Sequence, residues 1–187
     1  MRPAIARPEA QEFAPYYVTY VDATSNSLAA SGSTDIRDLL ASQCDMLEAL
    51  VSSVSDEQAN LGYAPGKWTL KESIVHVCDA ERIFSYRALR IARGDETPLA
   101  SFEQDGYVPE SRANSRTMAN ILAEFRAIRA STIALVASFD APAINKRGTA
   151  SGQTVSTRAL CWIMTGHVAH HVGLTRDRYL PALSGAK

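Results

Sequence analysis

Apolar residues recur every three or four positions in four long segments of the chain, and this is the period of an amphipathic helix. The segments cover residues 33–51, 69–91, 114–136 and 154–179. Nowhere do apolar and polar residues alternate in the manner of a strand, and no internal repeat is visible. The pattern therefore predicts an all-α protein built on four long helices.

The starts of these segments carry residues that cap helices. Thr69-Leu-Lys-Glu72 has the form of a capping box, in which a threonine and a glutamate each satisfy a free backbone N–H group of the first turn. Ser33 or Thr34 is expected to cap the first helix, and Thr154 or Ser156 the last. Three of the four segments therefore begin at residues that favour the start of a helix.

The connections between the helices differ in length and composition. Gly94 is placed to end the second helix, and Pro181 to end the last. Residues 1–32 are interpreted as an irregular N-terminal arm whose tyrosines dock on the body, and residues 145–153 as a polar link. Residues 95–113 form a crossover long enough to let two helices run parallel. These features predict a four-helix bundle.

Length, charge and cysteine content exclude several classes of protein. At 187 residues the chain is expected to be one domain, with the arm followed by the bundle of residues 33–181. A net charge of −1 gives no electrostatic reason to bind nucleic acid, and no apolar run approaches the roughly 20 residues needed to cross a membrane. Isolated cysteines (Cys44, Cys78 and Cys161) and an N-terminus without a signal-peptide core predict a cytoplasmic protein with reduced thiols.

Three of the four histidines lie in one segment, Gly166-His-Val-Ala-His-His171. His167 and His171 are one helical turn apart and point to the same side, and His76 in the second helix can supply a third imidazole. His171 is preferred because a spacing of four residues brings two imidazoles to the same side more closely. His167 with His170 would face one way nearly as well, however, and periodicity does not settle the choice. A lone histidine on an apolar stripe is more often a core residue than a ligand, but two buried imidazoles one turn apart need partners or a metal.

Three neutral imidazoles on one side of a divalent metal leave its other side free for water or substrate, which is typical of a catalytic site. Other metal sites fit the chain less well. It has no Glu-x-x-His pair for a di-iron bundle, no His-Glu-x-x-His for a zinc protease and no Cys-x-x-Cys for a structural zinc.

Several short motifs are distributed along the chain. They are Gly66-Lys-Trp-Thr-Leu-Lys-Glu72 leading to His76, Asp79-Ala-Glu-Arg82, Arg87-Ala-Leu-Arg-Ile-Ala-Arg-Gly-Asp95, Thr97-Pro-Leu, Gln104-Asp-Gly-Tyr107, Gly166-His-Val-Ala-His-His171 and Arg178-Tyr-Leu180. Together they make the chain resemble the DinB-like (YfiT-like) superfamily of four-helix-bundle metalloproteins from about residue 35 to residue 180.

The resemblance implies up-down-down-up connectivity and a divalent metal, usually zinc or nickel, whose ligands match His76, His167 and His171. Several members are thiol-dependent transferases or isomerases that use bacillithiol, mycothiol or glutathione-like cofactors, and many others are named metal-dependent hydrolases without an assigned reaction. We therefore expect a thiol-dependent S-transferase that acts on a small molecule. A metal-bound water or thiolate would react, and no protein side chain is proposed as nucleophile. A metal-dependent hydrolase and a non-catalytic, metal-stabilised binding module are the alternatives.

Further polar residues are candidates to surround the metal or to meet the substrate. Arg87 lies on the same helix face as His76 and is expected to bind an anionic substrate or to form a structural ion pair. His170 is expected in the layer around the ligands or at the surface. The crossover residues expected to cover the metal are Gln104, Asp105 and Tyr107.

The remaining residues are given structural interpretations. Glu81 lies on the apolar stripe and is expected to pair with Arg87 or Arg129, whereas Asp79 is interpreted as exposed or ion-paired. Trp68 and Trp162 are interpreted as packing residues. Apolar helix faces left outside the bundle are expected to support a homodimer.

Overall fold

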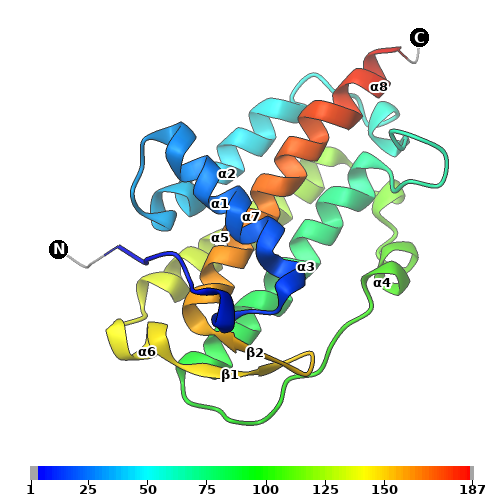
Figure 1. Cartoon of the computed structure of the whole chain (residues 1–187). Helices are drawn as coiled ribbons and strands as arrows, with labels where there is room; N and C mark the ends of the chain where they lie inside the picture. Colours follow the sequence, from blue (N-terminus) through cyan, green and yellow to red (C-terminus); the bar gives the residue numbers. More distant parts are fainter. Residues whose placement is uncertain (1–3, 186–187) are drawn as a thin grey trace.

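Four long helices form the body of the protein in the computed structural model, which describes residues 4–185 (Figure 1). They are α2 (Ile36–Val51), α3 (Leu70–Ala92), α5 (Met118–Ala137) and α7 (Thr157–Leu174). Both α5 and α7 pack against α2 and α3, so the four helices enclose one core. The predicted four-helix bundle is confirmed.

The bundle has up-down-down-up connectivity because one connection is long. Residues 93–117 return along the outside of the bundle from the end of α3 to the start of α5, so these two neighbouring helices run parallel (Figure 1). The predicted crossover also contains a short helix, α4 (Gln104–Glu110), which packs against α3. This packing places α4 beside the first three turns of α3.

The helices begin largely where their capping residues indicated. Thr69 and Glu72 form the predicted capping box, and Ser156 is the cap of α7. The first predicted cap is wrong by one residue, because Asp35 accepts a hydrogen bond from the backbone N–H of Arg37 at the start of α2. An aspartate carboxylate is at least as good an acceptor there as a hydroxyl.

The predicted irregular arm is wrong for its second half, because residues Val18–Ser31 form a helix, α1. The segment is rich in serine and threonine and has no clear apolar stripe, so its sequence predicts no helix. Its main partner is α7, where Gly166 lets the two backbones approach closely. Only residues 4–17 are irregular apart from two short 3₁₀ turns, and Tyr17 and Tyr20 do pack against the core.

Two further corrections concern short elements that the helical pattern does not predict. The polar link contains an antiparallel hairpin of β1 (Arg147–Ala150) and β2 (Gln153–Ser156), joined by Ser151 and Gly152 with positive φ. Such a two-residue turn matches the twist of paired strands. Another short helix, α6 (Ala141–Asn145), precedes the hairpin.

The last helix also does not end at Pro181. A π-helical turn (Thr175–Tyr179) follows α7, and α8 (Leu180–Gly185) continues beyond it. Pro181 is the second residue of α8, a position where the missing N–H of proline is tolerated.

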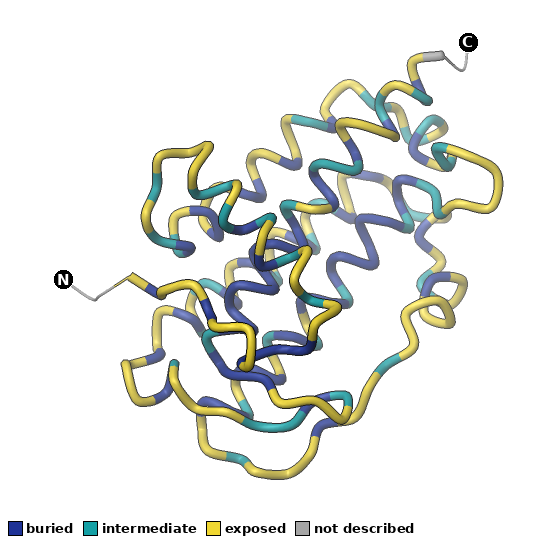
Figure 2. The backbone as a smooth tube through the Cα atoms, viewed as in Figure 1, coloured by how far each residue is buried: buried dark blue, intermediate teal, exposed yellow. Residues whose placement is uncertain are grey.

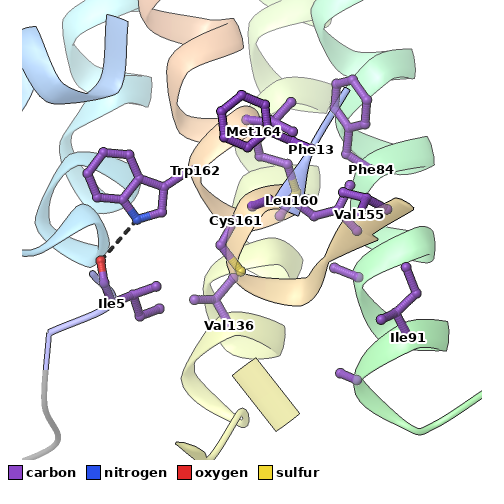
Figure 3. Packing of buried hydrophobic residues seen from close by; sticks show 14 of the residues in the cluster. Ile5, Phe13, Phe84, Ile91, Val136, Val155, Leu160, Cys161, Trp162 and Met164 are labelled. Carbon is purple, nitrogen blue, oxygen red and sulfur yellow. Dashed lines mark hydrogen bonds between the residues drawn. The ribbon is translucent and has the colours of Figure 1, made fainter. Parts of the chain in front are cut away.

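Buried residues follow the inner faces of the four long helices, whereas the crossover and the hairpin turn are mostly exposed (Figure 2). One end of the core is closed by the N-terminal segment, where the indole N–H of Trp162 donates to the carbonyl of Ile5 at 3.0 Å (Figure 3). Within the described residues, no helix is long and apolar enough to cross a membrane.

We expect Gly166→Ala to destabilise the protein by about 2–3 kcal/mol, because the added methyl group overpacks a backbone contact. A Cβ atom at this position would lie 1.8 Å from the carbonyl oxygen of Tyr20 and 2.7 Å from Thr24 Oγ1, so α1 would have to move away. Urea denaturation measures the loss.

Gly173→Ala is the matched control, because Gly173 lies in the same helix and, among residues 4–185, no packing neighbour lies within 4 Å of the methyl group that alanine would add. It should be neutral or stabilising by up to about 1 kcal/mol, since alanine is the better helix former. Equal effects of the two substitutions would contradict the close contact of α1 with α7.

Candidate metal centre

The packing of α3 against α7 brings three histidines together inside the bundle. His76 lies in the second turn of α3, and His167 and His171 lie one turn apart on α7. All three side chains are buried, and their candidate ligand nitrogens lie within 4.8 Å of one another. The Nε2 atoms of His76 and His167 are 3.2 Å apart. His170 is exposed and lies outside this group.

Burial keeps the three imidazoles neutral. It lowers the pKa of His76 to about 4, against a smaller opposing effect of the Asp105 carboxylate. It lowers the pKa of His171 to about 3, and the neighbouring imidazoles of His76 and His170 act in the same direction. The pKa of His167 is lowered well below its ordinary value, first by burial and then by the nearby imidazoles and Arg129. A neutral imidazole is the form that binds a metal.

Side chains around the three histidines restrict their orientation. Ser73 Oγ lies 3.0 Å from His171 Nδ1, which leaves Nε2 of this imidazole for another partner. Tyr20 of α1 packs edge-on against His167, with ring centroids 5.0 Å apart, and Trp68 lies at the same distance from His76. Sequence reasoning missed Ser73, although it lies one turn before His76, and it missed Tyr20 because α1 was not predicted.

The two sides of the cluster differ in access. Beside His171 lies a cavity of about 480 Å³, whose other lining residues are Tyr63, Gly66, Lys67, Trp68, Ser73, Asp105, Leu174 and Tyr179. Beside His76 lies only a hollow with no room for a water molecule, bounded in part by α4. Three neutral nitrogen donors next to open space fit a divalent ion such as zinc, with one side left for a small molecule.

The crossover residues lie on both sides of the cluster. Gln104 and Tyr107 line the closed hollow next to His76, whereas Asp105 lines the open cavity next to His171. The rings of Phe102 and Tyr107 are 5.8 Å apart, so the aromatic part of the crossover also packs on itself. The crossover is thus beside the histidines, as its length and composition suggested.

The role of Arg87 is structural in this fold. Its side chain is buried and donates to the carbonyl oxygen of Ala100 at 2.6 Å and to Ser151 Oγ at 3.0 Å. It lines neither the hollow beside His76 nor the cavity beside His171. Of the two uses expected for Arg87, contact with an anionic substrate therefore has no support, and the residue instead fixes the crossover and the hairpin.

The model of the DinB superfamily matches residues 39–175 of the chain. The chain belongs to the DinB superfamily. A protein of Bacillus pumilus (strain SAFR-032), provisionally named a metal-dependent hydrolase, is 32% identical over 79 residues, which is 41% of this chain and 45% of that protein. The chain therefore matches less than half the length of this curated relative.

A solved structure shows how much of the fold this DinB superfamily member shares. YfiT from Bacillus subtilis, described as a probable metal-dependent hydrolase with an unusual four-helix bundle topology, superposes with a TM-score of 0.69. The match covers 80% of this chain and 83% of that chain at 16% sequence identity. At this identity, the likeness shows the fold alone.

A buried polar network lies next to the histidines of this DinB superfamily member. Arg129 donates to Glu81 Oε2 at 2.7 Å and to Gln43 Oε1 at 2.8 Å, and Gln43 Nε2 donates to the carbonyl of Thr165 at 2.8 Å. Glu81 thus pairs with Arg129, one of its two expected partners. Because the four residues come from α2, α3, α5 and α7, the network joins all four bundle helices.

The surroundings of Asp79 and of the three cysteines agree with their structural interpretation. Asp79 is half-buried and lies 3.6 Å from Arg82, in agreement with its interpretation as an ion-paired carboxylate. All three cysteines are free and buried, and burial raises the pKa of the Cys161 thiol to about 12. A buried thiol that resists ionisation is a poor nucleophile.

The metal-free protein should lose stability as the pH falls below about 6.5, the ordinary pKa of histidine. Unfolded histidines take up protons near this pH, whereas folded His76 does so only near pH 4. The unfolded state then binds more protons, so the free energy of unfolding declines, by about 1 kcal/mol per pH unit for each buried imidazole. Urea denaturation between about pH 7.5 and about pH 5 measures the slope. His76→Asn should make it shallower, and an unchanged slope would argue against a buried neutral imidazole.

Proposed function

We propose that the protein binds one divalent metal through His76, His167 and His171 and hydrolyses a small molecule in the adjoining cavity. The observation that carries the proposal is the convergence of three neutral imidazoles beside a space of about 480 Å³. The names of the Bacillus pumilus protein and of YfiT support hydrolysis as the type of reaction. Zinc and nickel are the metals expected from the sequence resemblance.

The three histidines and Asp105 would have different roles in this reaction. A metal bound there would supply Lewis-acid activation of water and of the substrate carbonyl. The three histidines are neutral, so they would not reduce the positive charge of the metal ion, and the reactants would meet its full charge. In hydrolysis the water oxygen bonds to the acyl carbon, the bond from this carbon to the leaving group breaks, and a proton of the water passes to the leaving group. Asp105 lines the cavity, and its carboxylate would accept that proton first.

Thiol-dependent S-transfer is the second candidate, because a donor set without a carboxylate also stabilises a bound thiolate. The two reactions share the metal and differ in the second reactant. A chelator-sensitive conjugation of an electrophile that requires added thiol would support transfer. Chelator-sensitive cleavage of esters or amides without thiol would support hydrolysis. Activity in neither assay, together with a large chelator-induced loss of stability, would support the binding module.

His171→Ala should abolish stoichiometric metal binding and the metal-dependent reaction, whereas His170→Ala should retain both. The reason is geometric, since only His171 lies within the buried cluster of candidate ligand nitrogens. Elemental analysis of the purified variants gives metal per chain, and hydrolysis of a panel of activated esters gives activity. Loss of metal from the His170 variant with retention in the His171 variant would overturn this ligand set.

Ser73→Ala should weaken metal binding about 10- to 100-fold without unfolding the protein, because a hydrogen-bond partner that orients a metal-binding imidazole would be lost. Competition with a chromophoric chelator measures the dissociation constant. Ser85→Ala in the same helix is the matched control, since within residues 4–185 its hydroxyl donates only to the carbonyl of Arg82, at 3.0 Å. Equal metal affinities of the two variants would show that Ser73 does not position His171.

A further inference from the structure

The cavity beside His171 is lined by a lysine whose ammonium group has no partner among the described residues. Lys67 lines it, and among residues 4–185 the structure records no ion pair or hydrogen bond for its ammonium group. Of the residues that the structure describes, Lys67 is also the only lysine or arginine that lines this cavity. A cation at the wall of a small-molecule cavity, without a partner from the protein, is available to a ligand.

The backbone around Lys67 is fixed in place. The Lys67 N–H donates to the carbonyl of Ala64 at 3.2 Å, and a Cβ atom at Gly62 would lie 2.6 Å from the Lys67 carbonyl oxygen. The next carbonyl, that of Trp68, accepts a hydrogen bond of 2.8 Å from the buried hydroxyl of Tyr179. These contacts therefore fix the backbone from which the exposed side chain of Lys67 extends beside the cavity.

The other walls of the cavity define which part of a ligand meets which residue. Tyr63 and Trp68 line the cavity together with Lys67 and His171, and their aromatic surface suits a short carbon chain. Asp105 lines the same cavity and would repel a second anion, so it favours a ligand with its negative charge at Lys67. One ammonium group balances one negative charge, which matches a carboxylate better than a phosphate dianion.

We propose that this cavity binds small acyl compounds that carry a carboxylate, with the carboxylate at Lys67 and the acyl group that reacts at the three histidines. The proposal rests on the proposed hydrolysis and adds to it the class of substrate. Lys67 would be a specificity-determining residue, because it contacts a part of the substrate that does not react.

Matched esters test the class of substrate. The zinc-loaded full chain would be assayed at low ionic strength with 4-nitrophenyl hydrogen succinate and with its neutral methyl ester. We expect kcat/KM to be about tenfold higher for the anionic ester, the ratio that one hydrogen-bonded charge pair produces. Lys67→Gln should remove this preference by lowering kcat/KM for the anionic ester alone, and Lys67→Arg should restore most of it.

Lys146→Gln is the matched control, because Lys146 is exposed and lies far from the cavity. The cavity is lined by Tyr179, directly before α8, whereas Lys146 follows α6 at the other end of the bundle (Figure 1). It should leave the rates of both esters unchanged. Equal rates for the two esters in the wild type, or an equal effect of Lys67→Gln on both, would overturn the proposal while hydrolysis itself stands.

A binding experiment separates failure of this proposal from failure of the proposed hydrolysis. Calorimetric titration of the zinc-loaded protein with succinamate, a monoanion, should show binding that Lys67→Gln weakens about tenfold and that neutral succinamide does not reproduce. If neither ester is cleaved but succinamate binds in this way, the hydrolase proposal fails and the carboxylate site stands. Absence of succinamate binding, or an affinity unaffected by Lys67→Gln, would overturn the carboxylate site.

Discussion

The packing of α3 against α7 is the contact on which the site depends, because it places the Nε2 atoms of His76 and His167 3.2 Å apart inside the bundle. Burial removes water from both imidazoles and from His171, at about 1–3 kcal/mol for each polar group left without a partner. The same burial keeps the histidines neutral at physiological pH. The three buried histidines therefore lower the stability of the folded protein, and a bound divalent ion would restore it.

The position of α7 is held from two sides, and each side depends on a different kind of interaction. On one side, Gly166 allows the backbone of α1 to lie against α7. On the other side, Arg129 and Gln43 connect α7 to the remaining bundle helices through buried hydrogen bonds. Breaking a buried pair such as Arg129 with Glu81 leaves an uncompensated charge, so this network restricts how the bundle helices can shift.

Access to the histidines is asymmetric because the crossover covers one side of the cluster and not the other. On the side of His76, α4 leaves no room for water, whereas the cavity beside His171 has room for a small molecule. A reactant would therefore approach past Lys67 and Asp105 and not past Gln104 or Tyr107. Of the crossover residues expected at the site, Asp105 therefore lines the open cavity, whereas Gln104 and Tyr107 line the closed hollow.

The sequence by itself determined the four long helices, the capping residues of α3 and α7 and the three histidines on these two helices, because helical period and spacing are local properties of the chain. It did not decide between His170 and His171, since residues three and four apart lie on nearly the same face of a helix. It also could not predict α1, because this helix is stabilised by its contact with Gly166, a residue well over 100 positions away. The cavity, the exposure of Lys67 to it and the burial of Arg87 were likewise decided by tertiary packing, because each depends on segments that meet only in the folded protein.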